Sequence, residues 1–405
     1  MAPDKDLFFQ ITAQDKHSQA RCGLITTAHG SIPTPAFIPV ATQATIKGIT
    51  SAQLEEIGVE AVLGNTYHLY LRPGEKTVKK LGGLHQFMHW NKPLFTDSGG
   101  FQIFSLNKGM QKGMLDKNKR ALDKSICTIN DDGVEFKSHI DQSRHVLTPE
   151  KSIQIQRDLG ADIIFTFDEC LDFNADYETT KKAMQRTHHW AERCWREFSR
   201  LNHNRSQQRS TQSKQALYGI VQGGKYKDLR GESSRFIAGL PFPGIGIGSI
   251  FGEPKEKSLE VMKWMMDVLP PEKPKHLLGI GSVDDIFNYV QLGIDTFDCV
   301  LPTRLARVGY IFLRPESGGT RENKFRYRIL NVQFKDDKKP LDPACKCYVC
   351  QNFSRAYLRH LFKAGELLAY TLATYHNLWF FQRMMEEIRG SIEGGRFKEL
   401  KGKWN

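Results

Sequence analysis

Four polar residues stand at the ends of short apolar runs that are far apart in the chain. Asp97, Asp168 and Asp298 each follow such a run, and Gln222 follows a fourth. A carboxylate can attack the anomeric carbon of a sugar while a second carboxylate handles the proton. A further Asp with a Gln can read the edge of a purine, because carboxylates accept from N–H donors and amides both donate and accept. An enzyme that exchanges a base on a polynucleotide would need both of these functions, together with positive charge outside the site.

A structural role is the alternative for these residues, because Asp and Ser often cap a helix that follows a strand. Glycines stand near them, at Gly99, Gly100, Gly223 and Gly248. A glycine lets a ligand approach the backbone closely. Three Asp and one Gln in such surroundings favour a functional site over four unrelated helix caps.

Three cysteines near the end of the chain have the spacing of a metal site. Cys345, Cys347 and Cys350 lie within six residues, and His376 follows 26 positions after Cys350. Three thiolates and one imidazole complete a tetrahedral zinc site that leaves no position for water, so we expect a structural Zn²⁺. His360, only 10 residues after Cys350, is the alternative fourth ligand, and spacing does not exclude it.

Eight short runs rich in strand-forming residues must position these side chains. Each is closed by Gly or a polar residue, and they span residues 36–40, 61–63, 94–96, 162–167, 216–221, 244–248, 276–279 and 296–297. Segments of helical period lie between most of them, including residues 51–57, 149–159, 177–201, 227–240, 257–268 and 283–292. Thr148 followed by Pro149 is typical of a helix N-cap with proline in the first turn.

Apolar strands that alternate with helices imply a parallel sheet covered on both faces. Eight such units fit a (β/α)₈ barrel of the α/β class. A doubly wound open sheet is the rival, but its glycine-rich phosphate turn is not found after residues 36–40. The carboxyl ends of barrel strands surround one mouth, so we expect Asp97, Asp168, Gln222 and Asp298 to converge there.

Two regions follow from this pattern. We expect a catalytic barrel over residues 1–310, and a zinc-binding subdomain over residues 311–405 whose helices complete the barrel. A basic stretch at residues 107–132 is predicted to be an insertion, and the polar stretch at residues 202–214 a mobile loop. Residues 314–328 form another polar stretch outside the repeat.

The charge of the chain favours an anionic partner. Lys and Arg number 57 against 45 Asp and Glu, which gives a formal charge of +12. Such a balance favours nucleic acid, although charge for solubility is the alternative. The chain shows neither a long apolar run nor the pattern of a signal peptide, so we expect no membrane span. Five of the eight cysteines are scattered singly, which is typical of reduced thiols in a cytosolic protein.

Longer motifs connect these residues to a known family. They are TDSGGFQ at residues 96–102, HIDQSRH at 139–145, FDEC at 167–170, YGIVQGG at 218–224, FDCVLPTR at 297–304, the three cysteines and YHNL at 375–378. From about Phe8 to Phe397 the sequence resembles the tRNA-guanine transglycosylases, also called queuine tRNA-ribosyltransferases. This resemblance implies a (β/α)₈ barrel with a zinc subdomain, working as a homodimer.

The resemblance also implies an activity, which is that of a pentosyltransferase. Guanine at wobble position 34 of GU(N) anticodons, in the tRNAs for aspartate, asparagine, histidine and tyrosine, is exchanged for a 7-deazaguanine. Asp298 matches the nucleophile and Asp97 the general acid/base. The residues that match the base pocket are Asp97, Ser98, Gly99, Gly100, Phe101, Asp168, Gln222 and Gly248.

Two segments match the family's grip on the anticodon. They are Gly279, Ile280, Gly281, Ser282, Val283, Asp284 and Asp285, and then Thr303, Arg304, Leu305, Ala306 and Arg307. Cys345, Cys347, Cys350 and His376 match the zinc ligands, so the resemblance selects His376 over His360.

One segment departs from the family pattern. Residues 247–253 read IGSIFGE, where bacterial members usually carry Leu in place of Ser249 and Val in place of Phe251. Cys170 is of the bacterial type, but the reshaped pocket leaves both preQ1 and queuine as candidates for the incoming base. A non-catalytic tRNA-binding partner subunit would be expected to lack the nucleophile, and a member acting outside the anticodon would need a further RNA-binding domain.

Overall fold

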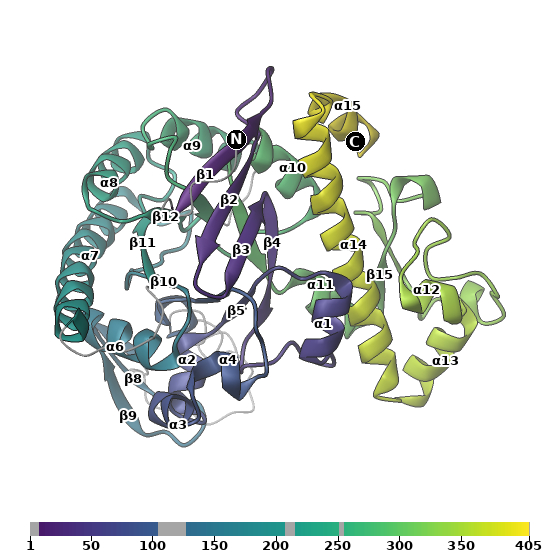
Figure 1. The fold of residues 1–405 in the computed structure, drawn as a ribbon, viewed down its shortest axis with the longest axis horizontal. Coiled ribbons are helices and arrows are strands. Elements are labelled where there is room, and N and C mark those ends of the chain that lie inside the picture. Colours follow the sequence, from purple (N-terminus) through teal and green to yellow (C-terminus); the bar gives the residue numbers. More distant parts are fainter. Residues whose placement is uncertain (1–7, 104–126, 207–214, 251–254, 405) are drawn as a thin grey trace.

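Eight parallel strands close into a barrel at the centre of the molecule (Figure 1). The computed structural model describes residues 8–103, 127–206, 215–250 and 255–404. The barrel strands are β4 (Ala36–Ala41), β5 (Val62–Gly64), β6 (Leu94–Thr96), β10 (Ile163–Phe165), β11 (Ala216–Val221), β12 (Gly244–Ile247), β13 (Lys275–Leu277) and β14 (Thr296–Cys299). Strand β14 pairs with β4 and β10 pairs with β6, so the sheet is closed and the predicted barrel is confirmed.

Helices cover the outside of the barrel. They are α1 (Ser51–Ile57), α2 (Thr66–Leu71), α3 (Glu75–Lys80), α4 (Gly83–Phe87), α6 (Pro149–Leu159), α7 (Tyr177–Ser206), α8 (Lys227–Gly239), α9 (Lys255–Met266), α10 (Val283–Gln291) and α11 (Leu301–Ala306). Capping residues fix the ends of several helices. As predicted, Thr148 is the N-cap of α6, and its hydroxyl accepts a hydrogen bond from the N–H of Lys151. Pro149 is the first residue of this helix. Gly160 ends that helix with φ of 79°, a conformation that glycine adopts without strain.

Among the described residues, three small antiparallel sheets are added to the barrel. The first, β1 (Phe9–Gln14), β2 (Arg21–Thr27) and β3 (Gly30–Thr34), contacts residues that precede barrel strands. The second is formed by β7 (Cys127–Ile129), β8 (Val134–Lys137) and β9 (Arg144–Leu147), between β6 and α6. The third pairs β15 (Tyr310–Phe312) with β16 (Arg326–Arg328), so the polar stretch at residues 314–328 ends in a strand.

The last part of the chain is helical and lies beside the barrel. It contains η1 (Pro315–Ser317), η2 (Val332–Phe334), α12 (Tyr348–Asn352), α13 (Arg355–Ala364), α14 (Leu368–Glu393) and α15 (Phe397–Lys403). Helix α14 runs along β4 and α11, and α12 and α13 lie on its other side (Figure 1). Among the described residues, no helix combines the length and apolar character that crossing a membrane requires.

Two predicted loops differ in part from the structure. Residues 202–206, predicted to be loop, continue α7, and they contain no Gly or Pro that would end the helix. Residues 127–129, predicted to belong to the insertion, form strand β7 against β8. Residues 107–126, 207–214 and 251–253 lie outside the described residues.

The core has an inner part within the barrel and an outer part between the barrel and its helices. Inside, the rings of Phe95 and Phe165 lie 5.4 and 5.1 Å from the ring of His276. The outer core joins the apolar faces of the helices to the outward side chains of the strands. Both layers are buried, which accounts for strands that are apolar on both faces.

A buried ion pair joins the first sheet to the barrel. Arg21 and Asp295 are 5% and 0% exposed, and two guanidinium nitrogens donate to the carboxylate at 2.9 and 2.6 Å. The N–H of Lys275 donates to the same carboxylate at 2.7 Å. Asp295 therefore neutralises a buried cation and also organises the start of β13.

Asp295→Asn should lower the free energy of unfolding by about 3–5 kcal/mol, because it leaves a buried guanidinium without its counter-charge. Denaturant unfolding measures this loss. The control is Glu135→Gln, which removes an exposed pair with Arg144 and should change stability by less than about 1 kcal/mol. Equal effects of the two substitutions would contradict the assignment.

Candidate active site and metal-ligand cluster

A cavity of about 460 Å³ lies at the carboxyl ends of the barrel strands. Asp97, Asp168, Gln222 and Asp298 all line it, so the structure brings the four strand-end residues together. The other strand ends contribute Val40, Thr42, Leu63, Asn65, Gly248, Ser249, Leu278 and Gly279. Closure of the barrel, and no local feature of the sequence, creates this site.

Asp97 is held by three donors from the same side of the site. The side-chain amide of Asn65 and the backbone N–H of Thr66 donate to its carboxylate, the latter at 2.8 Å. Nε2 of Gln102 donates to it at 2.6 Å. Burial raises the pKa of Asp97 to about 6 in spite of these donors. A carboxyl group with this pKa exchanges its proton readily near neutral pH.

Asp298 faces the same cavity from strand β14. Nε2 of His276 lies 3.0 Å from its Oδ1, and the N–H of Gly279 donates to that oxygen at 2.9 Å. Within the described residues both contacts fall on Oδ1, which leaves Oδ2 for a substrate. The charge of Asp298 also contributes to the raised pKa of Asp97, so the two carboxyl groups interact across the cavity.

Asp168 and Gln222 form a second polar pair in the cavity. Nε2 of Gln222 donates to one carboxylate oxygen of Asp168 at 2.7 Å, and the hydroxyl of Ser98 donates to the other at 3.1 Å. Burial raises the pKa of Asp168 to about 6, and these two donors act in the opposite direction. The pair presents both acceptors and an amide, which suits the edge of a purine.

Glycines beside Asp168 and Gln222 leave room that a larger residue would fill. A Cβ at Gly100 would lie 2.7 Å from the carbonyl oxygen of Asp168, and one at Gly248 would lie 2.5 Å from Nε2 of Gln222. Gly99 has φ of 86°, which favours glycine. The N–H of Gly248 donates to Val221 in the barrel, so its contribution here is the missing side chain. Phe101 lines the cavity with 47% of its surface exposed.

The two predicted RNA segments are only partly accessible. Gly279 and Arg304 are exposed and line the cavity. Val283, Thr303 and Ala306 are buried in the fold, where their side chains hold these segments in place. The other residues of the two segments are partly buried or, in the case of Gly281, buried.

The sequence argument missed several residues that line the cavity or contact its lining residues. Asn65 directly follows β5, so the strand-end rule, if applied to every strand, finds it. His276 lies inside the barrel and His68 on α2, and neither position carries a signal in the sequence. Arg230 is fully buried on α8 and donates to the carbonyl oxygens of Gly224, Gly248 and Ser249.

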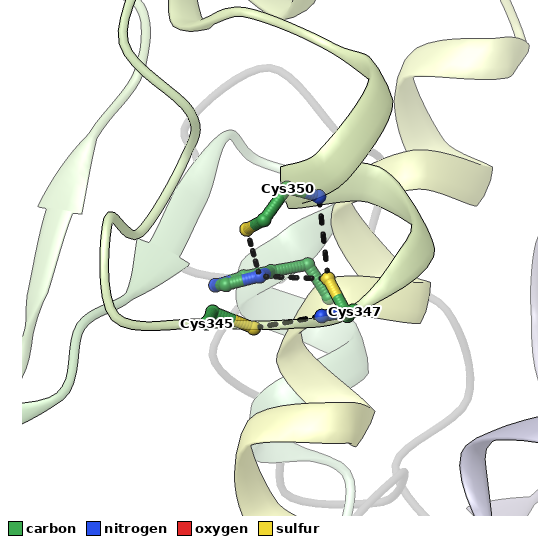
Figure 2. A group of neighbouring side chains, drawn as sticks. Cys345, Cys347 and Cys350 are labelled. Atoms are coloured by element: carbon green, nitrogen blue, oxygen red, sulfur yellow. Dashed lines mark hydrogen bonds between the residues drawn. The ribbon is translucent and has the colours of Figure 1, made fainter.

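The predicted metal ligands come together beside α14 (Figure 2). One ligand atom from each of Cys345, Cys347, Cys350 and His376 lies within 4.8 Å of the others, and the group could hold a metal ion. Nδ1 of His376 lies 3.5 and 3.3 Å from the sulfurs of Cys347 and Cys350. Tetrahedral zinc places such atoms about 3.6 Å apart. His360 is exposed on α13 and lies outside this group.

The orientation of His376 also suits a ligand. Its Nε2 lies 2.9 Å from the carbonyl oxygen of Phe312, which directs Nδ1 toward the sulfurs. Metal-binding histidines are commonly oriented by such a contact through the second ring nitrogen. The donor set and the orientation therefore both fit a closed metal site.

A second group of metal-ligand types lies where the first sheet meets the barrel. Nδ1 of His29 and Nε2 of His85 lie 2.7 and 3.2 Å from the carboxylate of buried Asp162. The two imidazole rings are stacked with centroids 3.6 Å apart and 17° between their planes. An ion between them would lie outside both ring planes, where no nitrogen lone pair points. We interpret these contacts as hydrogen bonds that hold the β2–β3 turn, which carries His29, against the barrel.

The arrangement supports chemistry at a sugar carbon. One carboxylate with an available oxygen faces a second carboxyl group whose pKa allows proton transfer, and a separate polar pair can hold a base. The barrel mouth, where catalytic groups of this fold collect, carries all of them.

Comparison with known proteins shows similarity over most of the chain. The chain matches the family described as "Queuine tRNA-ribosyltransferase" over residues 15–405. A queuine tRNA-ribosyltransferase from Caldanaerobacter subterraneus is 47% identical over 394 residues, with 97% of this chain and 95% of the relative covered. Relatives of the same name from Roseiflexus and Psychrobacter species are each 45% identical, with 98% and 95% of this chain and 99% and 92% of the relatives covered. The chain belongs to the queuine tRNA-ribosyltransferase family, pentosyltransferases that modify tRNA in the queuosine pathway.

Proposed function

We propose that this enzyme exchanges guanine at position 34 of GU(N) anticodons, in the tRNAs for aspartate, asparagine, histidine and tyrosine, for a 7-deazaguanine. The proposal rests on one observation. The carboxyl groups of Asp97 and Asp298 line the same cavity as Asp168 and Gln222, whose side chains suit the edge of a purine. Exchange with retention at the sugar needs a nucleophile and a proton carrier, which Asp298 and Asp97 supply.

In the first displacement, Oδ2 of Asp298 attacks C1′ of the ribose and the C1′–N9 bond to guanine breaks. The proton on Asp97 passes to the departing guanine, so guanine leaves neutral and Asp97 becomes a carboxylate. The contacts of His276 and Gly279 to Oδ1 of Asp298 support this step, because they hold the carboxylate while Oδ2 forms the bond.

In the second displacement, the incoming 7-deazaguanine occupies the same pocket. Asp97 accepts the proton from N9–H, N9 attacks C1′, and the bond to Asp298 breaks. The three donors around Asp97 stabilise its carboxylate form between the two steps, and burial keeps its proton affinity high enough for the first. The protonation state of Asp97 is restored at the end of each cycle.

The base pocket is proposed to work through the ionised form of Asp168. Guanine and its 7-deaza analogues present N1–H and an amino group, which a carboxylate accepts, and a carbonyl oxygen, which the amide of Gln222 can meet. Phe101 is exposed at the cavity and suits stacking on the base. Arg304, which lines the same cavity, is proposed to contact RNA. The positive net charge of the chain would strengthen binding to the phosphates.

The incoming base is preQ1 or queuine. Ser249, which departs from the bacterial pattern, has φ of 55°, and its hydroxyl lies 3.2 Å from the thiol of Cys170 in the cavity wall. Such a pair changes the shape and polarity of the pocket. The alternative of a non-catalytic tRNA-binding subunit is disfavoured, because both Asp97 and Asp298 are present and line the cavity.

We further propose that the Cys₃His group holds one structural Zn²⁺. When bound, the ion would link the cysteine loop to α14, the helix that packs against β4 and α11. The division into a barrel over residues 1–310 and a zinc-binding unit over residues 311–405 is part of this proposal. A closed donor set leaves no role for this ion in the exchange reaction itself.

The enzyme is also proposed to act as a homodimer in the cytosol. Large exposed apolar side chains occur in the segment that carries the metal-ligand cluster, namely Val332, Tyr348, Tyr357, Leu367 and Leu368. These exposed side chains support the proposal, because apolar groups gain free energy when another chain covers them.

Incubation of the enzyme with unmodified tRNA and either preQ1 or queuine, followed by mass analysis of nucleoside 34, tests the proposed function. One of the two bases should replace guanine in tRNAs with GU(N) anticodons. A tRNA with another base at position 34 is the control and should stay unchanged. Absence of exchange with both bases would contradict the proposal.

Asp298→Asn should abolish an enzyme–tRNA adduct that resists denaturation, and should lower the exchange of labelled guanine by roughly 10⁴-fold, because the nucleophile is lost. Denaturing gels and single-turnover kinetics measure the two effects. Asp267→Asn changes an exposed carboxylate at the end of α9 and should leave both unchanged. Exchange at the wild-type rate by Asp298→Asn would show that another group attacks C1′.

His376→Ala should reduce the zinc content below one ion per chain and lower the thermal unfolding midpoint by about 5 °C or more, because the ion stabilises the fold. Elemental analysis and thermal unfolding check this. His360→Ala, at the exposed alternative ligand, should keep one zinc per chain. Loss of zinc from His360→Ala with retention in His376→Ala would reverse the ligand assignment.

A further inference from the structure

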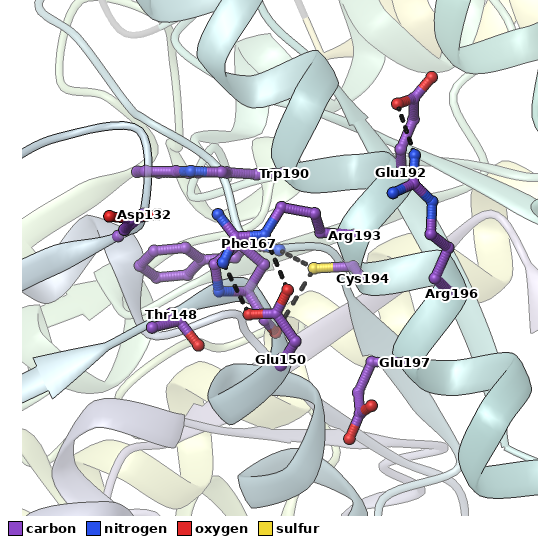
Figure 3. A network of polar contacts seen from close by, with 12 residues as sticks. Asp132, Thr148, Glu150, Phe167, Trp190, Glu192, Arg193, Cys194, Arg196 and Glu197 are labelled. Carbon is purple, nitrogen blue, oxygen red and sulfur yellow. Dashed lines mark hydrogen bonds and ion pairs between the residues drawn. The ribbon is translucent and has the colours of Figure 1, made fainter.

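One face of helix α7 contacts Phe167 and Glu169, the residues directly before and after Asp168 in the sequence. The N–H of Phe167 donates to Sγ of Cys194 at 3.3 Å, and the ring of Phe167 stacks on Trp190 with centroids 4.8 Å apart (Figure 3). On the other side, the N–H of Glu169 donates to the hydroxyl of Thr187 at 3.1 Å. The turn that carries Asp168 is therefore clamped to the helix before and after this residue.

Arg186 lies on the same face and adds a charge to this clamp. Its guanidinium donates to the carboxylate of Glu169, the residue next to Asp168, and donates to the carboxylate of Asp131 at 3.0 Å. The side chain of Glu169 is 8% exposed and that of Arg186 is 22% exposed. A nearly buried carboxylate requires a partner of opposite charge, and Arg186 is the cation that pairs with Glu169 among the described residues.

We propose that Arg186 is a positioning residue for base recognition, which neutralises Glu169 and thereby sets the charge with which Asp168 meets the base. This inference rests on the proposed base-binding role of Asp168. The residue does not touch the cavity itself, because its contacts run to Glu169 and to the β7–β8 turn.

The charges around Asp168 support this role. Ser98 and Gln222 donate to its carboxylate, and the charge of Glu169 raises its pKa. The buried thiol of Cys194 lies behind the turn, and its own pKa is raised by burial. Asp97, Asp298, Cys170 and Arg304 line the same cavity as Asp168. Glu169 is the acidic residue next to Asp168 in the sequence, and Arg186 neutralises its charge.

The sign of the effect follows from these contacts. Base binding requires the carboxylate form of Asp168, so the KM for guanine should rise as the pH falls through its pKa of about 6. Loss of Arg186 leaves the charge of Glu169 without its partner. Over the pH range in which Glu169 is ionised, this charge raises the pKa of Asp168 further and moves the rise in KM to higher pH. Loss of Glu169 alone leaves a cation nearby, and the rise should move to lower pH.

Helix α7 offers a matched control for this charge. Arg193 also links α7 to the β7–β8 turn, because it donates to the carbonyl oxygen of Asp131 at 2.8 Å. Both carboxylate oxygens of Glu150 accept from its guanidinium (Figure 3). It makes no contact with Glu169. Arg193→Gln therefore removes a similar ion pair and a similar tie to the turn, but leaves the charge beside Asp168 unchanged.

The experiment measures exchange of labelled guanine into unmodified tRNA between pH 5 and 8. Arg186→Gln should raise the KM for guanine about fivefold near pH 6 with little change in kcat, because raising the pKa of Asp168 from about 6 by one unit lowers its ionised fraction about fivefold at that pH. Arg186→Lys should restore part of the wild-type profile. The double variant Arg186→Gln with Glu169→Gln should return the profile toward wild type, and Arg193→Gln should not move it.

An unchanged pH profile in Arg186→Gln, or an equal shift in Arg193→Gln, would overturn the inference. If Arg186→Gln does not fold, Glu169→Gln carries the test through its opposite shift, and a shift in the same direction or none would overturn the proposal. Asp168→Asn separates the two levels of the argument. A wild-type KM in Asp168→Asn would remove the base-binding role, whereas a raised KM there with no effect of Arg186→Gln would remove only the role of Arg186.

Discussion

Closure of the parallel sheet is the constraint on which the rest of this structure depends. Strand β14 pairs with β4 in a register that places Phe297 opposite Phe37 and Asp298 opposite Ile38. A slip by one residue would turn Asp298 away from the cavity, because neighbouring side chains on a strand point to opposite faces. Parallel pairing around the whole barrel then brings every strand's carboxyl end to the same mouth, where Asp97 meets Asp298.

Neighbouring groups give the carboxyl groups at this mouth different roles. Asp97 and Asp168 both have a pKa raised to about 6, although amide, hydroxyl and backbone donors surround them. Asp298 instead receives both contacts on Oδ1, from His276 and Gly279, which leaves one oxygen toward the cavity. The same residue type can therefore carry a proton, hold a base or attack a sugar, depending on the neighbours that the fold supplies.

Helix α14 connects the metal-ligand cluster to the barrel. It carries His376 toward the three cysteines, while Gln382 on the same helix donates to the carbonyl oxygen of Phe37 in β4 at 3.2 Å. Asn377, next to His376, donates to the carbonyl oxygens of Pro302 and Tyr310. An ion bound at the cluster would thus stabilise a helix that also packs on the strand next to Asp298.

The amino-acid sequence by itself determined the eight barrel strands, the cap at Thr148 and the spacing of the cysteines, because periodicity, capping and ligand spacing are local properties. It also pointed to Asp97 and Asp298 through their positions after apolar runs. Only the tertiary structure selected His376 over His360 by geometry and placed His276 beneath Asp298. The contact of Arg186 with Glu169 was likewise invisible in the sequence. These contacts form between side chains that come together only when the barrel closes. The order of residues in the sequence does not show how far apart they lie in space.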